Sequence, residues 1–375
     1  MKNFKSGKYK QQNQYKSFTP SFINHKFVWD DKEVDVLIEK AMHYLGELNA
    51  YSNLVLDVDF FIQMHVAKEA TRSSMIEGTK TNIDEAVLGP EDIKPEQRDD
   101  WEEVQNYIKA LNSSIEMLDK LPLSIRLVKK SHKILLSGVR GKHKLPGQIR
   151  RSQNWIGGSD LSDAFFIPPH NEDLPDLLSD FDKFWNNDNL ELSTLIKIAI
   201  SHYQFETIHP FLDGNGRIGR LLITLQLIDS GILSKPTLYL SDFFEKNRVS
   251  YYDSLTRVRV SNDLEQWIKF FLNGVVKTAQ DSIAIFNEIN KLRSEYVKQI
   301  DKIGIRSKKA YQLLEYMFSR PIVNNKKIMK ELGISFKSAT RLTSDLLKLG
   351  VISEITGFSR NKLFVLKDYL DLFRK

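Results

Sequence analysis

The chain of 375 residues contains no cysteine. This absence excludes a disulfide-stapled scaffold, a zinc site with cysteine ligands and a cysteine nucleophile, and it is typical of proteins from a reducing compartment. The chain also lacks an apolar run of about 18 residues, so we expect no membrane-spanning helix. Its first ten residues include four lysines and no hydrophobic core, unlike a secretory signal. Together these absences predict a cytoplasmic protein.

The net charge of +6 is unevenly distributed along the chain. Residues 1–26 carry six basic and no acidic side chains, and residues 305–375 carry 15 basic and six acidic ones. Between them, residues 27–304 hold 33 basic and 42 acidic side chains. An acidic body with two basic ends suggests separate modules. Because residues 1–26 are polar and aperiodic, we expect them to form a basic mobile arm.

One polar stretch lies between two apolar helical patterns. Residues 209–220 read HPFLDGNGRIGR, and apolar positions recur at helical spacing on either side. The stretch is therefore predicted to be a loop that leads into a second helix. There the amides of residues 214–216 can point at an anion, and the helix dipole adds to the attraction. Arg217 and Arg220 supply guanidinium groups suited to phosphate oxygens.

The same stretch offers a metal ligand and a base. Asp213 presents one hard oxygen ligand, of the kind that holds Mg²⁺ beside a nucleotide. His209 is the side chain of this stretch that titrates near neutral pH. Residues 214–219 also match the dinucleotide-binding pattern Gly-x-Gly-x-x-Gly, but that pattern requires a preceding strand, and a helix is predicted there. The residues alone thus favour a phosphate and metal site with a base beside it.

Residues 209–220 resemble the signature of the Fic family, His-x-Phe-x-Asp/Glu-Gly-Asn-Gly-Arg-x-x-Arg, at every specified position. The resemblance covers residues 30–300 and implies an all-α Fic-type helical core with a short β-hairpin flap. An N-terminal helical region would then span 27–140, and the catalytic core would span 141–300. The implied reaction is adenylyl transfer, in which ATP and a Ser, Thr or Tyr hydroxyl of a protein give AMP-protein and pyrophosphate.

The resemblance also implies roles for single residues. His209 would act as the general base, and Asp213 would hold Mg²⁺ against the phosphates of ATP. Asn215 and the neighbouring amides would receive the charge that develops on the α-phosphate. Arg217 would bind the phosphate tail near its α/β end, and Arg220 would bind the γ-phosphate. The implied nucleotide-binding residues are Gly214, Asn215, Gly216, Arg217, Ile218, Gly219, Arg220 and Tyr252, with Tyr252 preferred to Tyr251.

A second motif ends the helix predicted for residues 58–78. Ser73 and Glu77 are four residues apart and so share one face of that helix. A carboxylate at a helix C-terminus is unfavourable against the dipole and would gain from a cationic partner. These residues, with Gly78, match the inhibitory motif of the Fic family, which implies that Glu77 pairs with Arg220 and inhibits the enzyme. From the residues alone, an exposed glutamate at a helix end is the alternative.

Residues 147–170 interrupt the helical pattern with glycines, β-forming residues and prolines, an order that predicts a surface hairpin. The hairpin resembles the flap of the Fic family, which holds a target protein by strand addition. A plain connecting hairpin is the alternative. Beyond it, helices are predicted at 263–279 and 281–300, which would complete the body.

Residues 305–375 form a separate unit in the sequence. Helices at 308–319, 324–332 and 335–349, followed by a hairpin at 351–366, predict a winged helix-turn-helix domain. Its excess of basic residues favours duplex DNA as a partner, and a protein-contact domain is the alternative.

Three readings of function stay open at this point. The first is an adenylyltransferase autoinhibited by Glu77. The second is a Fic relative that removes AMP or transfers another group. The third is a DNA-binding regulator whose Fic core senses a nucleotide. The sequence also leaves open whether the protein is a homodimer.

Overall fold

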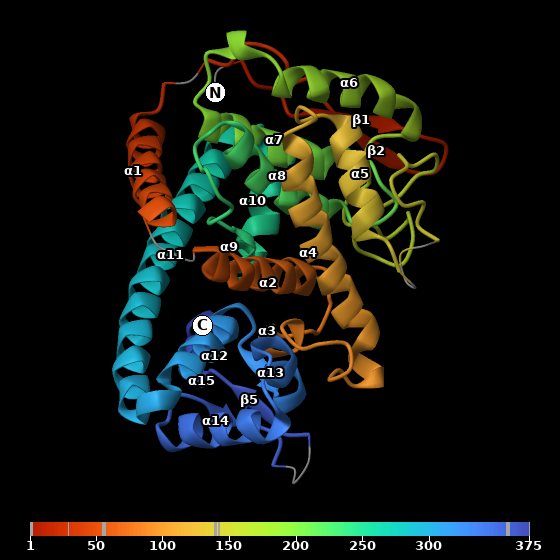
Figure 1. Ribbon diagram of the computed structural model, residues 1–375. Helices are drawn as coiled ribbons and strands as arrows, with labels where there is room; N and C mark the ends of the chain where they lie inside the picture. The colour runs from red at the N-terminus through yellow and green to blue at the C-terminus, as the bar shows by residue number, and fades with distance from the viewer. Residues whose placement is uncertain are drawn as a thin grey trace.

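The computed structural model describes residues 3–28, 30–54, 58–138, 141, 143–357 and 361–374. A helical body occupies most of the molecule, and a smaller C-terminal module lies at one end of it (Figure 1). The helices of the body are α1 (Lys32–Leu54), α2 (Val58–Ile76), α3 (Ile83–Ala86), α4 (Arg98–Leu118), α5 (Ile125–Leu135), α6 (Leu174–Trp185), α7 (Thr194–Ile208), α8 (Asn215–Asp229), α9 (Ser241–Lys246), α10 (Arg248–Ser261) and α11 (Leu264–Ile300). Short 3-10 turns lie at Pro95–Gln97, Asn171–Asp173, Asp188–Leu190 and Asp301–Arg306. No helix in the described part of the chain combines the length and apolar character needed to cross a bilayer.

The centre of the body is the pair α7 and α8, which are joined by residues 209–214. Thirteen of the 15 residues are buried in α7, and 13 of 15 are buried in α8. Helices enclosed on all sides belong in the interior of a domain. The other helices surround this pair, so the loop between α7 and α8 is fixed at both ends by the core.

Helix α11 is one continuous helix of 37 residues. The sequence predicted two helices there, at 263–279 and 281–300, and that division is wrong. Neither glycine nor proline interrupts the expected junction, and Lys277 pairs with Asp281 across it at 3.0 Å. The first half of α11 packs beside α1, and its far end reaches the C-terminal module (Figure 1).

The N-terminal residues form a two-stranded antiparallel sheet of β1 (Gly7–Gln11) and β2 (Lys16–Pro20). This differs from the mobile arm expected for residues 1–26. Phe18 and Ile23 are each 1% exposed, so burial against the body holds the segment in place. The few apolar residues of this polar segment are irregularly spaced, and therefore no period was visible in the sequence.

The segment 147–170 contains much less strand than a hairpin would. One bridge joins Ile156 to Phe166, and the N–H of each donates to the carbonyl of the other. Strand β2 lies next to this pair, because the Phe18 N–H donates to the Ile167 carbonyl at 2.9 Å. The segment is therefore supported on one side by the N-terminal sheet, which the sequence did not suggest.

The C-terminal module consists of α12 (Ser307–Ser319), β3 (Ile322–Asn324), α13 (Asn325–Leu332), α14 (Phe336–Lys348), β4 (Ser353–Glu354), β5 (Leu363–Val365) and α15 (Lys367–Arg374). Its antiparallel sheet has the order β3-β5-β4. The caps explain the helix boundaries: Asn324 caps α13, Gly333 ends it in the left-handed region, and Ser335 caps α14. Helix α15 follows the strands and was not predicted.

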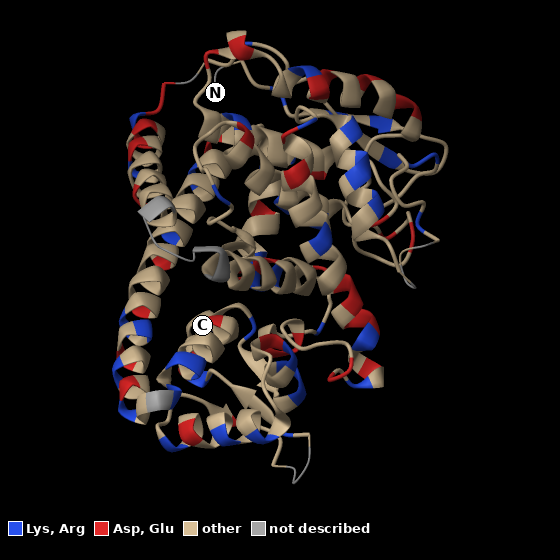
Figure 2. Ribbon diagram, viewed as in Figure 1, with Lys and Arg blue, Asp and Glu red and all other residues tan. Residues whose placement is uncertain are grey.

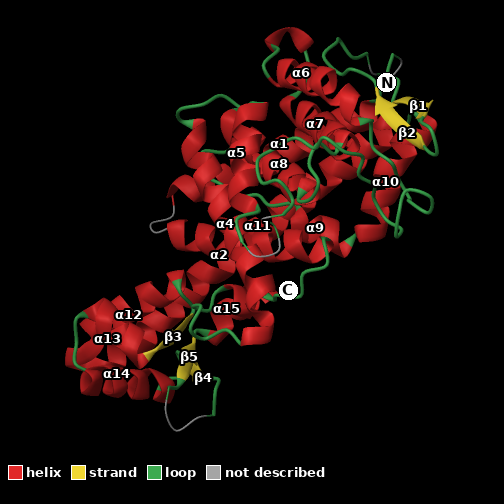
Figure 3. Cartoon of the chain, turned by 90° about the vertical axis from the view of Figure 1, so that its right-hand side faces the viewer, coloured by secondary structure: helices red, strands yellow, loops and turns green. Residues whose placement is uncertain are grey.

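Helix α2 lies between the body and the C-terminal module, as both views show (Figures 1 and 3). Val66 and Ala70 of α2 belong to the apolar cluster of the body. Met64 and Ala67 belong to the apolar cluster of the module. A change in the packing of the module therefore acts directly on α2, which leads into the motif at Ser73 and Glu77.

Candidate active site

The loop between α7 and α8 begins and ends with left-handed backbone. His209 closes α7 with φ of 49°, and Gly214 precedes α8 with φ of 77°. The first amides of a helix have no partner within it, so those of Asn215, Gly216 and Arg217 are left for an anion. Glycine suits position 214 because side-chain-bearing residues rarely adopt its conformation.

His209 is partly buried, and burial lowers its pKa to about 4. The imidazole is therefore neutral at physiological pH and able to accept a proton. Its Nδ1 lies 3.3 Å from the Glu206 carbonyl oxygen, which can only accept a hydrogen bond. This contact favours the tautomer with the proton on Nδ1 and leaves the lone pair of Nε2 for a substrate.

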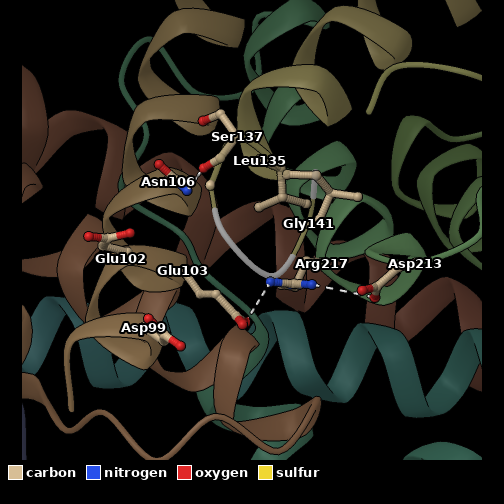
Figure 4. A pocket seen from close by; sticks show the side chains of 11 residues that line it. Asp99, Glu102, Glu103, Asn106, Leu135, Ser137, Gly141, Asp213 and Arg217 are labelled. Carbon is tan, nitrogen blue, oxygen red and sulfur yellow. Dashed lines mark hydrogen bonds and ion pairs between the residues drawn. The ribbon is translucent and has the colours of Figure 1, made fainter. Parts of the chain in front are cut away.

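Asp213 and Arg217 lie beside the start of α8 (Figure 4). The Asp213 carboxylate is 45% exposed, accepts the Gly214 N–H at 2.6 Å and lies 3.5 Å from an Arg217 guanidinium nitrogen. Arg217 also pairs at 3.0 Å with Glu103 of α4, on the acidic part of that helix (Figures 2 and 4). In the described residues no three acidic or histidine side chains come together as a metal cage. The set fits an Mg²⁺ ion held by one carboxylate and by substrate phosphates.

Arg220 and Glu77 meet although 143 residues separate them. An Arg220 guanidinium nitrogen lies 2.7 Å from Glu77 Oε1, and the same side chain donates to the Ser73 hydroxyl at 2.9 Å and to its carbonyl at 2.8 Å. Burial would raise the pKa of Glu77, but the charge and hydrogen bond of Arg220 outweigh it, so this pKa lies below its usual value. A Cβ at position 216 would come within 2.2 Å of Glu77 Oε1, so Gly216 leaves room for the carboxylate.

The side chain of Asn215 makes hydrogen bonds within the loop, and its expected contact with a phosphate stays a prediction. Its Oδ1 accepts the Phe211 N–H, and its Nδ2 donates to the Phe211 carbonyl, both at 2.8 Å. The amide side chain therefore closes the loop on itself. Its backbone amide stays available at the helix start. Ile218 is fully buried in the core, so its side chain serves packing.

Tyr251 and Tyr252 occupy different environments. Tyr251 is 1% exposed, and its hydroxyl lies 2.8 Å from His202 Nε2 inside the body. Tyr252 is partly exposed and lies near the guanidinium of Arg248. Burial raises the pKa of Tyr252, and the charge of Glu77 raises it further, which places this ring near the pair of Glu77 and Arg220. The choice of Tyr252 over Tyr251 stays a prediction.

Sequence reasoning missed the residues that hold the loop from behind. His132 of α5 accepts the Gly147 N–H on Nδ1 at 2.8 Å, so its Nε2 carries the proton and donates to the Asp213 carbonyl at 2.9 Å. Arg150 and Asn154 hold further carbonyls of the loop. The signal for Arg150 and Asn154 was a run of polar residues within 147–170, which composition alone could not distinguish from a surface hairpin.

Glu206, in the last turn of α7, was also missed. Burial raises its pKa to about 7, and its Oε1 has no hydrogen-bond partner in the described residues. No pattern in the sequence marked this residue, because a glutamate three residues before a histidine looks like any polar position of a helix.

Two family models match adjacent parts of the chain. The Fic/DOC family N-terminal model matches residues 36–116, and the Fic/DOC family model matches residues 122–227. These two parts of the chain are therefore Fic/DOC family domains, as residues 209–220 suggested.

Its relatives include two curated proteins named protein adenylyltransferase Fic. The one from Drosophila erecta is 28% identical and the one from Drosophila melanogaster 29% identical, each over 174 residues, or 46% of this chain. The match covers 31% of each relative, so the chain spans about a third of their length.

A solved structure with a similar fold covers nearly the whole chain. The crystal structure of a Fic family protein from Desulfovibrio desulfuricans G20 aligns over 92% of this chain and 98% of its own, with a TM-score of 0.57 and 19% identity. At this identity the likeness shows a shared fold.

Proposed function

We propose that the protein transfers AMP from ATP to a hydroxyl side chain of a protein. The observation that carries the proposal is the arrangement of residues 209–217, in which the neutral imidazole of His209 precedes the free amides at the start of α8. The relatives named protein adenylyltransferase Fic support the same reaction.

In this reaction the hydroxyl oxygen attacks the α-phosphorus of ATP and loses its proton to His209 Nε2. The bond from the α-phosphorus to the bridging oxygen breaks, and pyrophosphate leaves. The amides at the start of α8 stabilise the charge on the α-phosphate oxygens. Asp213 is the residue that would hold Mg²⁺, which neutralises phosphate charge when bound. Arg217 and Arg220 would hold the phosphate tail, and Tyr252 would lie against the nucleoside.

The pair of Arg220 with Glu77 supports autoinhibition of this reaction. The Glu77 carboxylate is paired with the Arg220 guanidinium, which would otherwise bind the γ-phosphate. ATP can then bind with its tail displaced and its α-phosphorus misaligned. The target would dock on the segment 147–170, where Trp155 and Phe165 are 40% and 67% exposed.

The proposed function is tested by intact mass spectrometry after incubation with MgATP, in the presence of lysate proteins. Protein carrying one added AMP is expected, and His209→Ala should lower the yield by about 10²–10⁴-fold. His43→Ala, in an exposed histidine of α1 that lies outside both the loop and the segment 147–170, is the matched control. ATP binding without any covalent product from wild type and Glu77→Gly would favour a nucleotide sensor instead.

A second function, binding of duplex DNA by a winged helix-turn-helix domain, is favoured by the surface of α14. A groove of about 580 Å³ runs between α13, α14 and β5, with Lys326 and Lys362 among its lining residues. Lys337 and Arg341 are exposed on α14, where a recognition helix would carry phosphate and base contacts. A shift of the full-length protein on duplex DNA that weakens steeply with salt would support this function, and no shift at low salt would refute it.

A further inference from the structure

His209 has an unusual backbone for a residue that carries a side chain. Its φ of 49° places it in the left-handed region, where residues other than glycine need support from their surroundings. Two side chains supply that support at its carbonyl oxygen. Arg150 Nε donates to this oxygen at 3.0 Å, and Asn154 Nδ2 donates to it at 3.3 Å.

Arg150 is held entirely by main-chain carbonyls. It is 2% exposed, and in the described part of the chain it has no carboxylate partner. Its guanidinium donates to the carbonyls of Ile208, His209, Pro169 and Ser152. A buried cation without a counter-ion is costly. The Arg150 guanidinium therefore serves a geometric purpose, because it joins the end of α7 to residues near the start and the end of the segment 147–170.

Asn154 extends the same contact along the loop. Its Nδ2 donates to the Phe211 carbonyl at 2.8 Å as well as to that of His209. The backbone N–H of Arg150 donates to the Pro210 carbonyl between them at 2.9 Å. Three consecutive carbonyls of the loop are thus fixed by Arg150 and Asn154.

We propose that Arg150 and Asn154 are positioning residues of the transfer reaction, which hold the backbone of His209 so that its imidazole is aimed at the hydroxyl of a target docked on segment 147–170. This proposal rests on the adenylyl transfer proposed above. It assigns a catalytic consequence to two buried residues that touch neither ATP nor the reacting atoms.

The proposal separates turnover from nucleotide binding. The residues that would hold ATP keep their own supports, because Asn215 closes the loop on Phe211 and Ser73 holds Arg220. Loss of Arg150 or Asn154 therefore misaligns the base and leaves the phosphate site in place. A misplacement of about 1 Å in a reacting group can cost on the order of 10² in rate.

Arg150 also acts on His209 through its charge. Burial is the main cause of the lowered pKa of His209, Glu77 and the Glu206 carbonyl oppose it, and the cations Arg150 and Arg259 lower it further. Replacement of Arg150 by a neutral residue should therefore raise the pKa of this imidazole. A residue that only stabilised the fold would not shift it.

The test uses Arg150→Lys, Arg150→Met and Asn154→Ala in a Glu77→Gly parent. Arg126→Lys is the control, because Arg126 is an exposed arginine of α5 that lies outside segment 147–170. We expect kcat to fall on the order of 10²-fold in the three variants, with the KM for ATP and the binding of a fluorescent ATP analogue within about twofold of the parent. The control should match the parent. Lysine at position 150 should not restore kcat, since a single ammonium group cannot donate to several carbonyls in the way that a planar guanidinium does.

A second measurement does not depend on activity. The ring signals of His209 in histidine-labelled protein should move in Asn154→Ala and Arg150→Lys, and the titration should shift to higher pH in Arg150→Met. An inactive parent would refute adenylyl transfer, and the ring signals would still decide whether these residues position His209. Unchanged ring signals in Asn154→Ala, kcat within threefold of the parent, or equal losses of kcat and ATP affinity would each overturn the proposal.

Discussion

Glu77→Gly should raise the rate of AMP transfer strongly. The Glu77 carboxylate lies 2.7 Å from the Arg220 guanidinium and is paired with it, although this guanidinium is proposed to anchor the γ-phosphate. If the pair displaces the α-phosphorus by about 1 Å, its removal is worth on the order of 10² in kcat. The KM for ATP should change far less, since the penalty falls on alignment.

The structure also sets the expected loss of stability. Arg220 is 1% exposed and loses one charge-assisted hydrogen bond in the variant, but it keeps two bonds to Ser73. Such a bond is worth about 1.5–3 kcal/mol, and the 35% exposure of Glu77 places the loss near the lower end. A small fall in Tm should therefore accompany the large gain in activity.

The assay follows label from α-labelled ATP into the protein and into lysate targets. Arg220→Ala should be inactive, and the double variant with Glu77→Gly should stay inactive, because the γ-phosphate then has no anchor. This non-additivity distinguishes a shared site from two independent effects. An unchanged rate in Glu77→Gly, or activity restored in the double variant, would refute the reasoning.

Three further predictions concern other parts of the molecule. Burial raises the pKa of Glu206 to about 7, so between about pH 4.5 and pH 7 the folded state holds a proton that the unfolded state has released, and the free energy of unfolding falls as pH rises. In Glu206→Gln this loss, roughly 3 kcal/mol, should vanish from denaturation curves taken across that range. The same pH dependence in wild type and variant would contradict the prediction. Truncation after Asp301 should lower Tm and raise the basal rate of AMP transfer, because Met64 and Ala67 of α2 lose the apolar residues of the module that bury them. An unchanged rate in a folded fragment would show that the module does not restrain α2. Arg341→Ala should weaken binding of duplex DNA and reduce its salt dependence in gel shifts, whereas an unaltered shift would remove α14 from the contact.

The sequence by itself determined the features that depend on neighbouring residues. The loop at 209–214 was predictable because two apolar helical periods stop and restart around it. The helices predicted at 324–332 and 335–349 lie close to α13 and α14, because capping residues such as Asn324, Gly333 and Ser335 act within a few positions of the chain. The pairing of Glu77 with Arg220 came from family resemblance, since no local rule joins positions 143 residues apart.

Only the tertiary structure decided which partners the polar groups of the site find. Arg217 meets Glu103 and Arg150 meets the carbonyl of His209 because packing brings α4 and the segment 147–170 against the loop. The N-terminal sheet forms because Phe18 finds a buried place on a completed body. A buried polar group must be satisfied by whichever partner the fold brings within reach, and that choice is made by packing, which local sequence does not encode.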